Sequence, residues 1–217
     1  MTVVGNTGQI DSNVYGPDGA TVISTLQRKF ATSGGASFRG NTGLFLINGV
    51  NTVTYTNAVV NGTFGGSVVT TTENSYSKVV GDERQTYGLT VSVVVQGTTT
   101  AASSYFTPYA YTGAPLNPAL GTTYTNSFST TTEVGGQVQP TLAQTGKTTY
   151  TTESVTVPAG TFAACKVKVE ASGGATVSNV SYSWLVGSGR YKGLVVRTAN
   201  ANGVKTSEAT HLMVNGQ

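Results

Sequence analysis

The segment TTESVTVPAGTFAACKVKVE, residues 151–170, decides the fold class because it has the pattern of a β-hairpin. Residues 151–157 are rich in Thr and Val, whose β-branched side chains fit a pleated strand. The strand ends at Pro158, which cannot donate a ladder hydrogen bond. Ala159-Gly160 then turns the chain, and residues 161–169 return beside the first strand.

Side chains alternate in character along the returning strand, as expected when successive residues point to opposite faces of a sheet. One face carries Cys165, Val167 and Val169, and the other carries Lys166, Lys168 and Glu170. This strand is therefore expected to have one dry and one wet face.

The composition extends this pattern to the whole chain of 217 residues, which contains 38 Thr and 29 Val but 10 Leu and 3 Ile. Charged residues make up 10% of the chain, against roughly 25% in an average soluble domain. These values exclude a helical bundle, a coiled coil and a Rossmann-type α/β fold. The 28 Gly suit many tight turns.

Turn-forming pairs separate strand-sized runs along the chain. The pairs are Asp18-Gly19, Gly34-Gly35, Asn48-Gly49, Asn61-Gly62, Gly65-Gly66, Gly135-Gly136, Gly173-Gly174, Asn202-Gly203 and Asn215-Gly216. The runs predict twelve strands, near residues 20–31, 43–47, 50–60, 67–73, 85–96, 98–106, 122–134, 145–157, 161–171, 175–186, 191–199 and 204–214.

We therefore predict an all-β fold: a single large twisted antiparallel sheet or half-barrel of about twelve strands, with a β-sandwich as the alternative. The chain is expected to be one domain over residues 1–217. Residues 107–120 hold three Pro and two Tyr. They predict a crossover loop, because Pro removes ladder donors.

Charge and cysteine content restrict the partners and the compartment. The net charge of +3 is spread without a basic stripe, which argues against a nucleic-acid partner. No apolar run approaches the roughly 20 residues of a membrane helix. The single Cys165 excludes an internal disulfide framework. The start MTVVGNTGQ carries no signal-peptide pattern, so the protein is cytoplasmic or has lost its leader. The composition favours export, and we expect a periplasmic, outer-membrane-associated or extracellular protein.

Residues able to carry catalysis are sparse. His211 is the single histidine, and no GxSxG elbow supplies a nucleophile for it. One His and one Cys cannot form a tetrahedral zinc site. A pair of carboxylates could still be assembled in space from Glu73, Glu133, Glu153 or Glu170. We predict no catalytic residues, no metal site, no cofactor and no enzymatic activity.

A ligand-binding surface is the more promising feature. Val180, Tyr182 and Trp184 share one strand face, opposite Ser181, Ser183 and Leu185. Such a face either fills a core, which is the more common outcome in a small β domain, or lines a pocket for an apolar guest. Val180, Tyr182 and Trp184 are the predicted ligand-binding residues.

The hairpin also carries a family resemblance. Its VPAGTF segment, residues 157–162, resembles a signature of bacterial exported proteins of unknown function. Pro115-Leu116 followed by LGTTY at 120–124 is similar to the segment that precedes the signature. Ser183-Trp184 followed by GLVV at 193–196 is similar to the ending, although residues 187–190 lengthen the link. The resemblance implies a half-barrel similar to the lipoprotein-carrier (LolA-like) fold, whose concave face holds acyl chains.

Two hypotheses for function follow. The first is a non-enzymatic exported protein that binds a lipid or another apolar ligand on a concave sheet. It would associate with a membrane only peripherally, through a lipid anchor. The second is a cell-surface structural or adhesive β module that self-associates through the edges of its Thr-rich strands. The sequence leaves the oligomeric state open.

Overall fold

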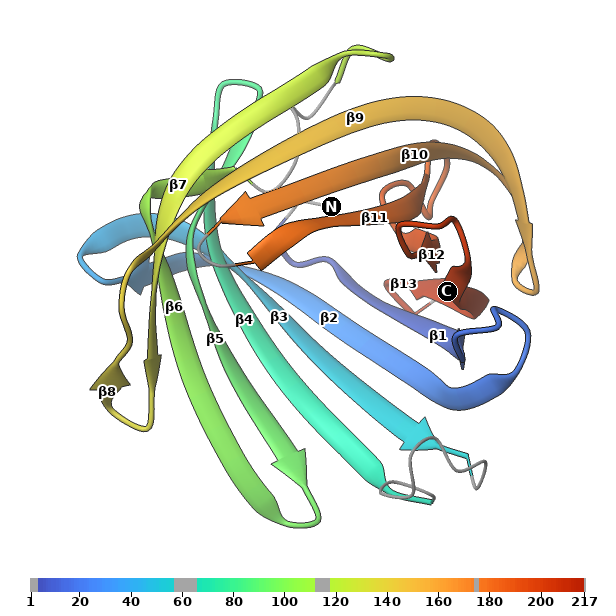
Figure 1. The fold of residues 1–217 in the computed structure, drawn as a ribbon, viewed down its shortest axis with the longest axis horizontal. Helices are drawn as coiled ribbons and strands as arrows, with labels where there is room; N and C mark the ends of the chain where they lie inside the picture. Colours follow the sequence, from blue (N-terminus) through green and yellow to red (C-terminus); the bar gives the residue numbers. More distant parts are fainter. Residues whose placement is uncertain (1–3, 57–65, 112–117, 174–175, 217) are drawn as a thin grey trace.

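The computed structural model of the protein contains strands and connecting turns and describes residues 4–56, 66–111, 118–173 and 176–216 (Figure 1). The strands are β1 (Thr7–Tyr15), β2 (Val22–Phe38), β3 (Asn41–Tyr55), β4 (Val68–Val80), β5 (Glu83–Val95), β6 (Thr98–Tyr111), β7 (Thr123–Val134), β8 (Gln137–Val138), β9 (Leu142–Val157), β10 (Gly160–Gly173), β11 (Thr176–Val186), β12 (Val195–Ala199) and β13 (Lys205–Val214).

All of these strands belong to one antiparallel sheet in the order β6-β5-β4-β3-β2-β1-β13-β12-β11-β10-β9-β7-β8. A further pairing of β6 with β7 joins the two ends, so twelve strands form a closed barrel and β8 extends β7. The predicted single antiparallel sheet of about twelve strands is confirmed. The closure of one sheet upon itself, in place of two stacked sheets, excludes the β-sandwich alternative.

The barrel walls cross each other steeply. In Figure 1, strands β7, β9, β10 and β11 run over β1 to β6 at a large angle. Tilted strands produce this crossing, because a closed barrel requires strands inclined by about 35–45° to its axis. The lower ends of β3 to β6 extend beyond the crossing strands in the same view.

Register and burial together identify the inner face of the barrel. Residues paired across neighbouring strands share a face, so the register sorts the described residues of the wall into two sets. On β9, Thr148 and Tyr150 are buried while Lys147 and Thr151 on the other face are exposed. Their partners across β10 repeat the pattern, because Tyr150 pairs with the buried Val167. We call the face of Tyr150 the inner face and that of Lys147 the outer face.

The largest hydrophobic cluster lies where the tip of the β9–β10 hairpin packs against β11 to β13. Its buried members are Ile10, Val155, Val157, Ala164, Trp184, Val186, Leu194, Val196, Ala199, Ala209 and Leu212. The amide of Ala159 at the hairpin tip donates to the carbonyl of Ala209 at 3.0 Å. The VPAGTF hairpin predicted from the sequence is confirmed, and its tip anchors the core.

A second hairpin tip covers the outer face of β4 to β7. Phe38, at the end of β2, stacks on Tyr76 with ring centroids 4.5 Å apart. The next residue, Arg39, forms an ion pair with Glu133 at 2.5 Å and lies 4.7 Å from the ring centroid of Tyr105. Outer-face residues beneath this tip, such as Gly88, are therefore buried.

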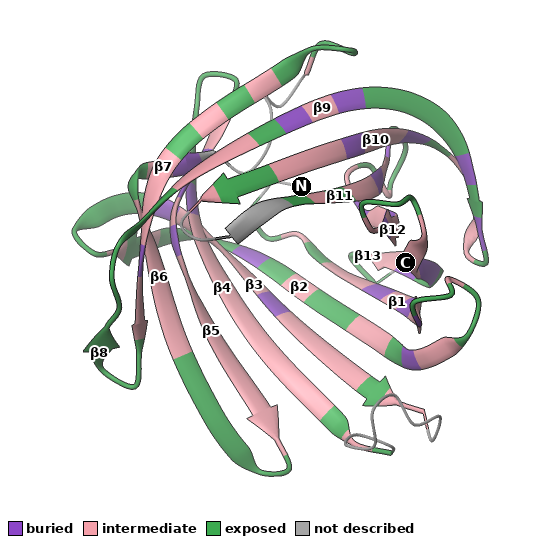
Figure 2. Ribbon diagram, in the orientation of Figure 1, coloured by how far each residue is buried: buried purple, intermediate pink, exposed green. Residues whose placement is uncertain are grey.

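The wall of β3 to β6 is incompletely shielded from solvent. The accessible surface is 11194 Å², whereas a compact chain of this mass exposes roughly 9400 Å². Five consecutive residues of β5, 91–95, are all partly exposed, so both faces of this wall reach solvent. Figure 2 shows β3 to β6 largely in the colour of partial exposure.

Four sequence predictions are wrong in detail. Gly34-Gly35 does not separate two strands: both residues lie inside β2, where Gly35 has a positive φ at a shift of the register with β3. Asn48-Gly49 is not a turn: both residues lie inside β3 without a positive φ, so the predicted strands at 43–47 and 50–60 share one strand. The start of the predicted 107–120 loop continues β6 to Tyr111. No strand was predicted at β1, whose sequence TGQIDSNVY lacks an alternating pattern. Residues 57–65, which include Asn61-Gly62, lie outside the described part of the chain.

Gly88 offers a test of the β2–β3 tip. A Cβ at this position would lie 2.2 Å from the Phe38 ring and 2.6 Å from the carbonyl oxygen of Ser104. We expect Gly88→Ala to lower the free energy of unfolding by about 1–3 kcal/mol, because the ring and the backbone must both shift. Urea unfolding followed by tryptophan fluorescence measures the change.

Gly146→Ala is the matched control, since its Cβ would meet no atom within 4 Å. It should leave stability unchanged or raise it by about 0.4–1 kcal/mol. Equal losses in both variants would contradict the packing of Phe38 over Gly88.

Candidate functional site

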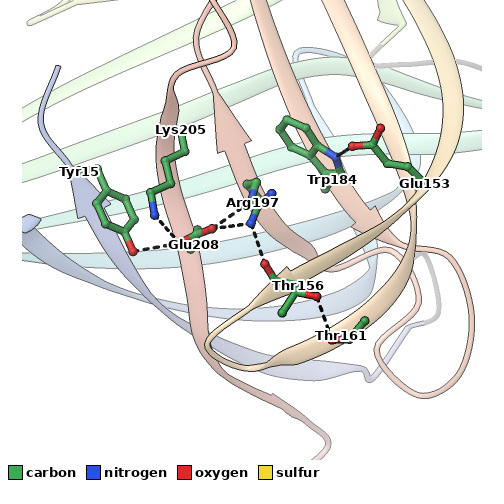
Figure 3. Close-up of polar contacts among 8 residues, drawn as sticks. All are labelled: Tyr15, Glu153, Thr156, Thr161, Trp184, Arg197, Lys205 and Glu208. Carbon is green, nitrogen blue, oxygen red and sulfur yellow. Dashed lines mark hydrogen bonds and ion pairs between the residues drawn. The ribbon is translucent and has the colours of Figure 1, made fainter. Parts of the chain in front are cut away.

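A polar network joins β1, β12 and β13 on the outer face, with Glu208 at its centre (Figure 3). Arg197 donates to Glu208 Oε1 from Nη2 at 2.6 Å and from Nε at 3.0 Å. Lys205 Nζ lies 2.9 Å from Oε2, and the Tyr15 hydroxyl donates to Oε2 at 3.0 Å. Arg197 Nη2 also donates to the carbonyl of Thr156 at 2.6 Å, which ties the β9–β10 tip to the network.

The charges in this network shift each other's titration. Burial alone would raise the pKa of Glu208, but hydrogen bonds from Lys205, Tyr15 and Arg197 outweigh it, and the net pKa is lowered. In turn the hydrogen bond to Glu208 raises the pKa of Lys205. The arrangement is a fully satisfied ion cluster, which holds its strands together and leaves no group poised for proton transfer.

The predicted ligand-binding residues Val180, Tyr182 and Trp184 do share one face, as their pairing with Glu170, Lys168 and Lys166 shows. This is the outer face. Whether the three contact a ligand stays a prediction.

Trp184 is only 6% exposed because the hairpin tip and its charged neighbours enclose it. Its indole N–H donates to Glu153, and Lys166 Nζ and Arg197 Cζ lie 5.0 and 5.8 Å from its ring centroid (Figure 3). Trp184 therefore packs in the core. This is one of the two outcomes that the sequence pattern allowed for its strand face.

The inner face of β3 to β5 carries a group of partly exposed valines, with Thr71 and Glu73 of β4 beside two of them. The register places Val53, Val69 and Val95 side by side across these three strands. The next inward residues of β5, Val93 and Val91, are partly exposed as well. Because these side chains are partly exposed, an apolar molecule could contact them directly.

The inner wall on β7 and β9, which β6 separates from β5, is more polar. Asn126 Nδ2 and Thr130 Oγ1 are buried and have no hydrogen-bond partner among the described residues. Tyr150 on β9 is buried and interacts electrostatically with Arg84 of β5, and burial lowers the pKa of Arg84. Sequence analysis missed Arg84, Asn126 and Thr130, because no local pattern shows that β5 and β7 face a common interior.

The other residues that could carry catalysis or bind a metal either lie away from this inner wall or form ion pairs. His211 is exposed on the outer face, 3.4 Å from Asp11. Glu153, Glu170 and Glu133 each pair with a cation, namely Lys166, Lys168 and Arg39. Burial raises the pKa of the Cys165 thiol, which disfavours the reactive thiolate. No group of three His, Cys, Asp or Glu residues converges in the described part of the chain.

Three shallow clefts of about 440, 360 and 430 Å³ are lined mainly by outer-face Thr, Ser, Ala and Asn side chains. Their linings combine hydroxyl groups with the apolar parts of small side chains, and Val91, Leu26 and Phe128 are the larger apolar residues among them.

Comparison with known protein families and with curated proteins gives no match. Among solved structures, the chain is similar to an assumed exported protein with a YmcC-like fold from Bacteroides fragilis. The identity is 14%, the TM-score 0.43, and the match covers 97% of this chain and 96% of the other.

The described residues form no helix that is long and apolar enough to cross a membrane.

Glu208 makes the stability of the outer network depend on pH. The pKa of Glu208 is lower in the folded state than in the unfolded state, where it is about 4.3. Its contribution to the free energy of unfolding is therefore fully present above the unfolded pKa. It is lost as the pH falls through the folded pKa. We expect Glu208→Gln to lower the free energy of unfolding at pH 7 by roughly 1–3 kcal/mol. Its stability should then fall less between pH 7 and pH 3 than that of the wild type.

Urea unfolding at both pH values measures these effects. Glu170→Gln is the control, because Glu170 pairs with Lys168 in a partly exposed setting where an ion pair contributes about 0–1 kcal/mol. If the wild type and Glu208→Gln lost the same free energy of unfolding between pH 7 and pH 3, the assigned role of Glu208 would be contradicted.

Proposed function

We propose that this chain is a non-enzymatic exported protein whose barrel interior holds a lipid or another apolar ligand. The observation that carries the proposal is the group of partly exposed valines on the inner face of β3 to β5, namely Val53, Val69, Val91, Val93 and Val95. Apolar surface left in water costs about 25 cal/mol per Å². A ligand that covers these side chains recovers that free energy.

Exposure inside a closed barrel supports the same function. Inner-face residues of β5 are partly exposed although they belong to a closed barrel. The lower ends of β3 to β6 extend past the crossing strands in Figure 1, so the crossing strands do not run over this part of the wall in that view. The resemblance of the VPAGTF segment to exported proteins, and of their fold to lipoprotein carriers, favours a lipid as the ligand class and the periplasm or cell surface as the location.

The self-associating adhesive module has less support. It rested on exposed strand edges, and barrel closure pairs the edges that an open sheet would leave free. The low charge that motivated it has another explanation, since Thr hydroxyls pair across strands on the outer face, as in Thr123 with Thr149 at 2.8 Å.

Two adjacent residues of β5 test the inner wall. Val93 and Val94 are both partly exposed, but Val93 points inward and Val94 outward. We expect Val93→Glu to weaken binding of the neutral dye N-phenyl-1-naphthylamine at least tenfold, because a carboxylate would face the apolar ligand. Val94→Glu should bind like the wild type.

Dye fluorescence titrations give the affinities, and circular dichroism confirms that both variants fold. Native mass spectrometry of protein purified from its own host should show a bound lipid in the wild type. Equal dye binding by both variants, together with no co-purified lipid, would refute the proposed function.

A further inference from the structure

The seam that closes the barrel is short and has a cleft beside each end. The pairing of β6 with β7 comprises six residue pairs, between residues 102–107 and 129–134. The cleft of about 440 Å³ is lined at one end of the seam by Ala102 and Glu133. The cleft of about 430 Å³ is lined at the other end by Thr107 and Ser129. Along the seam, these six pairs are what lies between the two clefts.

The β2–β3 tip, residues 36–43, lies across this seam on the outer face. Arg39 at its end forms the ion pair with Glu133 of β7 and places its guanidinium carbon 4.7 Å from the ring centroid of Tyr105 of β6. Tyr105 and Glu133 both belong to residue pairs of the seam. One side chain from a distant hairpin therefore holds both strands of the closure.

A second short seam shows what a permanent attachment looks like in this fold. The strands β12 and β13 form three residue pairs, and the β9–β10 tip packs against them. That tip carries Val155 and Val157, whose residues are only 2% and 5% exposed. By contrast, the side chains of Arg39 and Glu133 are 43% and 31% exposed, and ion pairs at such exposure hold weakly. The β2–β3 tip is thus the more easily released of the two.

The β2–β3 tip can bend where it leaves the sheet. Gly35 in β2 and Gly43 in β3 have φ of 74° and 68°, and a Cβ at either position would meet no atom within 4 Å. The register of β2 with β3 shifts between Ser33 and Ala36, beside Gly35. Bulges bend a strand, and such positions can absorb the change of φ and ψ in a hinge motion. Both strands of the tip therefore contain a hinge.

We infer that the β2–β3 tip is a latch on the seam between β6 and β7, and that its release opens a lateral gate for the ligand. Segments with few buried contacts open locally while the rest of a protein stays folded. The inner side of the seam suits an apolar ligand, because Phe106 and Phe128 face the interior as partly exposed rings with centroids 5.5 Å apart. The latch depends on the contacts of the tip alone, whereas the gate also rests on the proposed function and adds the route of entry.

Arg39→Asn tests the latch without damaging the turn that carries it. Arg39-Gly40 has φ of 48° and 81°, which are the positive values of a type I′ turn, and Asn-Gly is the preferred sequence there. The variant therefore keeps the hairpin and removes the side chain that reaches β6 and β7. Gln96→Asn is the matched control, because Gln96-Gly97 at the exposed β5–β6 turn has φ of 48° and 82°.

Hydrogen exchange of the ligand-free full chain, followed by mass spectrometry, measures opening of the seam. In Arg39→Asn the amides of residues 102–107 and 129–134 should exchange roughly tenfold faster than in the wild type, while those of the β9–β10 tip keep their rates. Glu133→Gln, which removes the other half of the ion pair, should act in the same way, and Gln96→Asn should match the wild type. Unchanged exchange at the seam in both variants, or equally faster exchange over the whole chain, would overturn the latch.

Stopped-flow fluorescence with N-phenyl-1-naphthylamine tests the gate. Arg39→Asn should raise the association and dissociation rate constants of the dye by about fivefold or more and leave its Kd nearly unchanged, because the latch controls access and not the site itself. Faster exchange at the seam with unchanged dye rates would overturn the gate, since the dye would then enter elsewhere. Absence of dye binding by the wild type would refute the proposed function and the gate together, while hydrogen exchange would still decide the latch.

Discussion

The pairing of β6 with β7 is the interaction on which the rest of the structure depends. Residues 102–107 of β6 pair with residues 129–134 of β7, and this short seam turns an open sheet into a barrel. The seam combines backbone hydrogen bonds with a hydroxyl pair between Ser104 and Thr132 at 2.9 Å. Without it β6 would be a free edge, and the strand edges of a sheet are templates for aggregation.

The abundant Thr residues pair with one another across neighbouring strands of the barrel. Cross-strand hydroxyl pairs occur on the outer face, for example between Thr123 and Thr149 at 2.8 Å and between Ser127 and Thr145 at 3.1 Å. Such pairs contribute about 0.2–1 kcal/mol each. Because Thr combines high strand propensity with a hydroxyl that water or a neighbour can satisfy, this chain covers a large outer surface with few charges.

The sequence predicted those features that local patterns determine. Alternation correctly separated Val167 from Lys166, and the VPAGTF turn correctly placed a hairpin, because both depend on neighbouring residues. The tertiary role of each face could not be predicted in the same way. Trp184 has an apolar side chain yet lies on the outer face, because a hairpin tip distant in sequence covers it. Asn48-Gly49 has the best local turn signal of β3, but pairing with β2 and β4 on both sides keeps it extended.

The candidate site was beyond sequence analysis for a related reason. Arg84 and Tyr150 come from strands that approach one another only when the ring closes, and Asn126 is conspicuous only because its amide Nδ2 has no hydrogen-bond partner among the described residues. A polar residue in a Thr-rich strand carries no signal that it faces a lumen. The valines of β5 are equally ambiguous, since residues 91–95 include four Val on two faces, and only the register separates Val93 from Val94.

The two hairpin tips explain how a barrel can remain stable with a partly exposed inner face. Most small β-barrels obtain their core from side chains that fill the lumen. Here a large part of the buried apolar surface lies at one end of the barrel, where Val155 and Val157 of the β9–β10 tip pack against Trp184 and Val186. The β2–β3 tip buries further outer-face residues through Phe38 and Arg39. Because these contacts at the two hairpin tips supply stability, the inner face of β3 to β5 can keep partly exposed valines that a guest could cover.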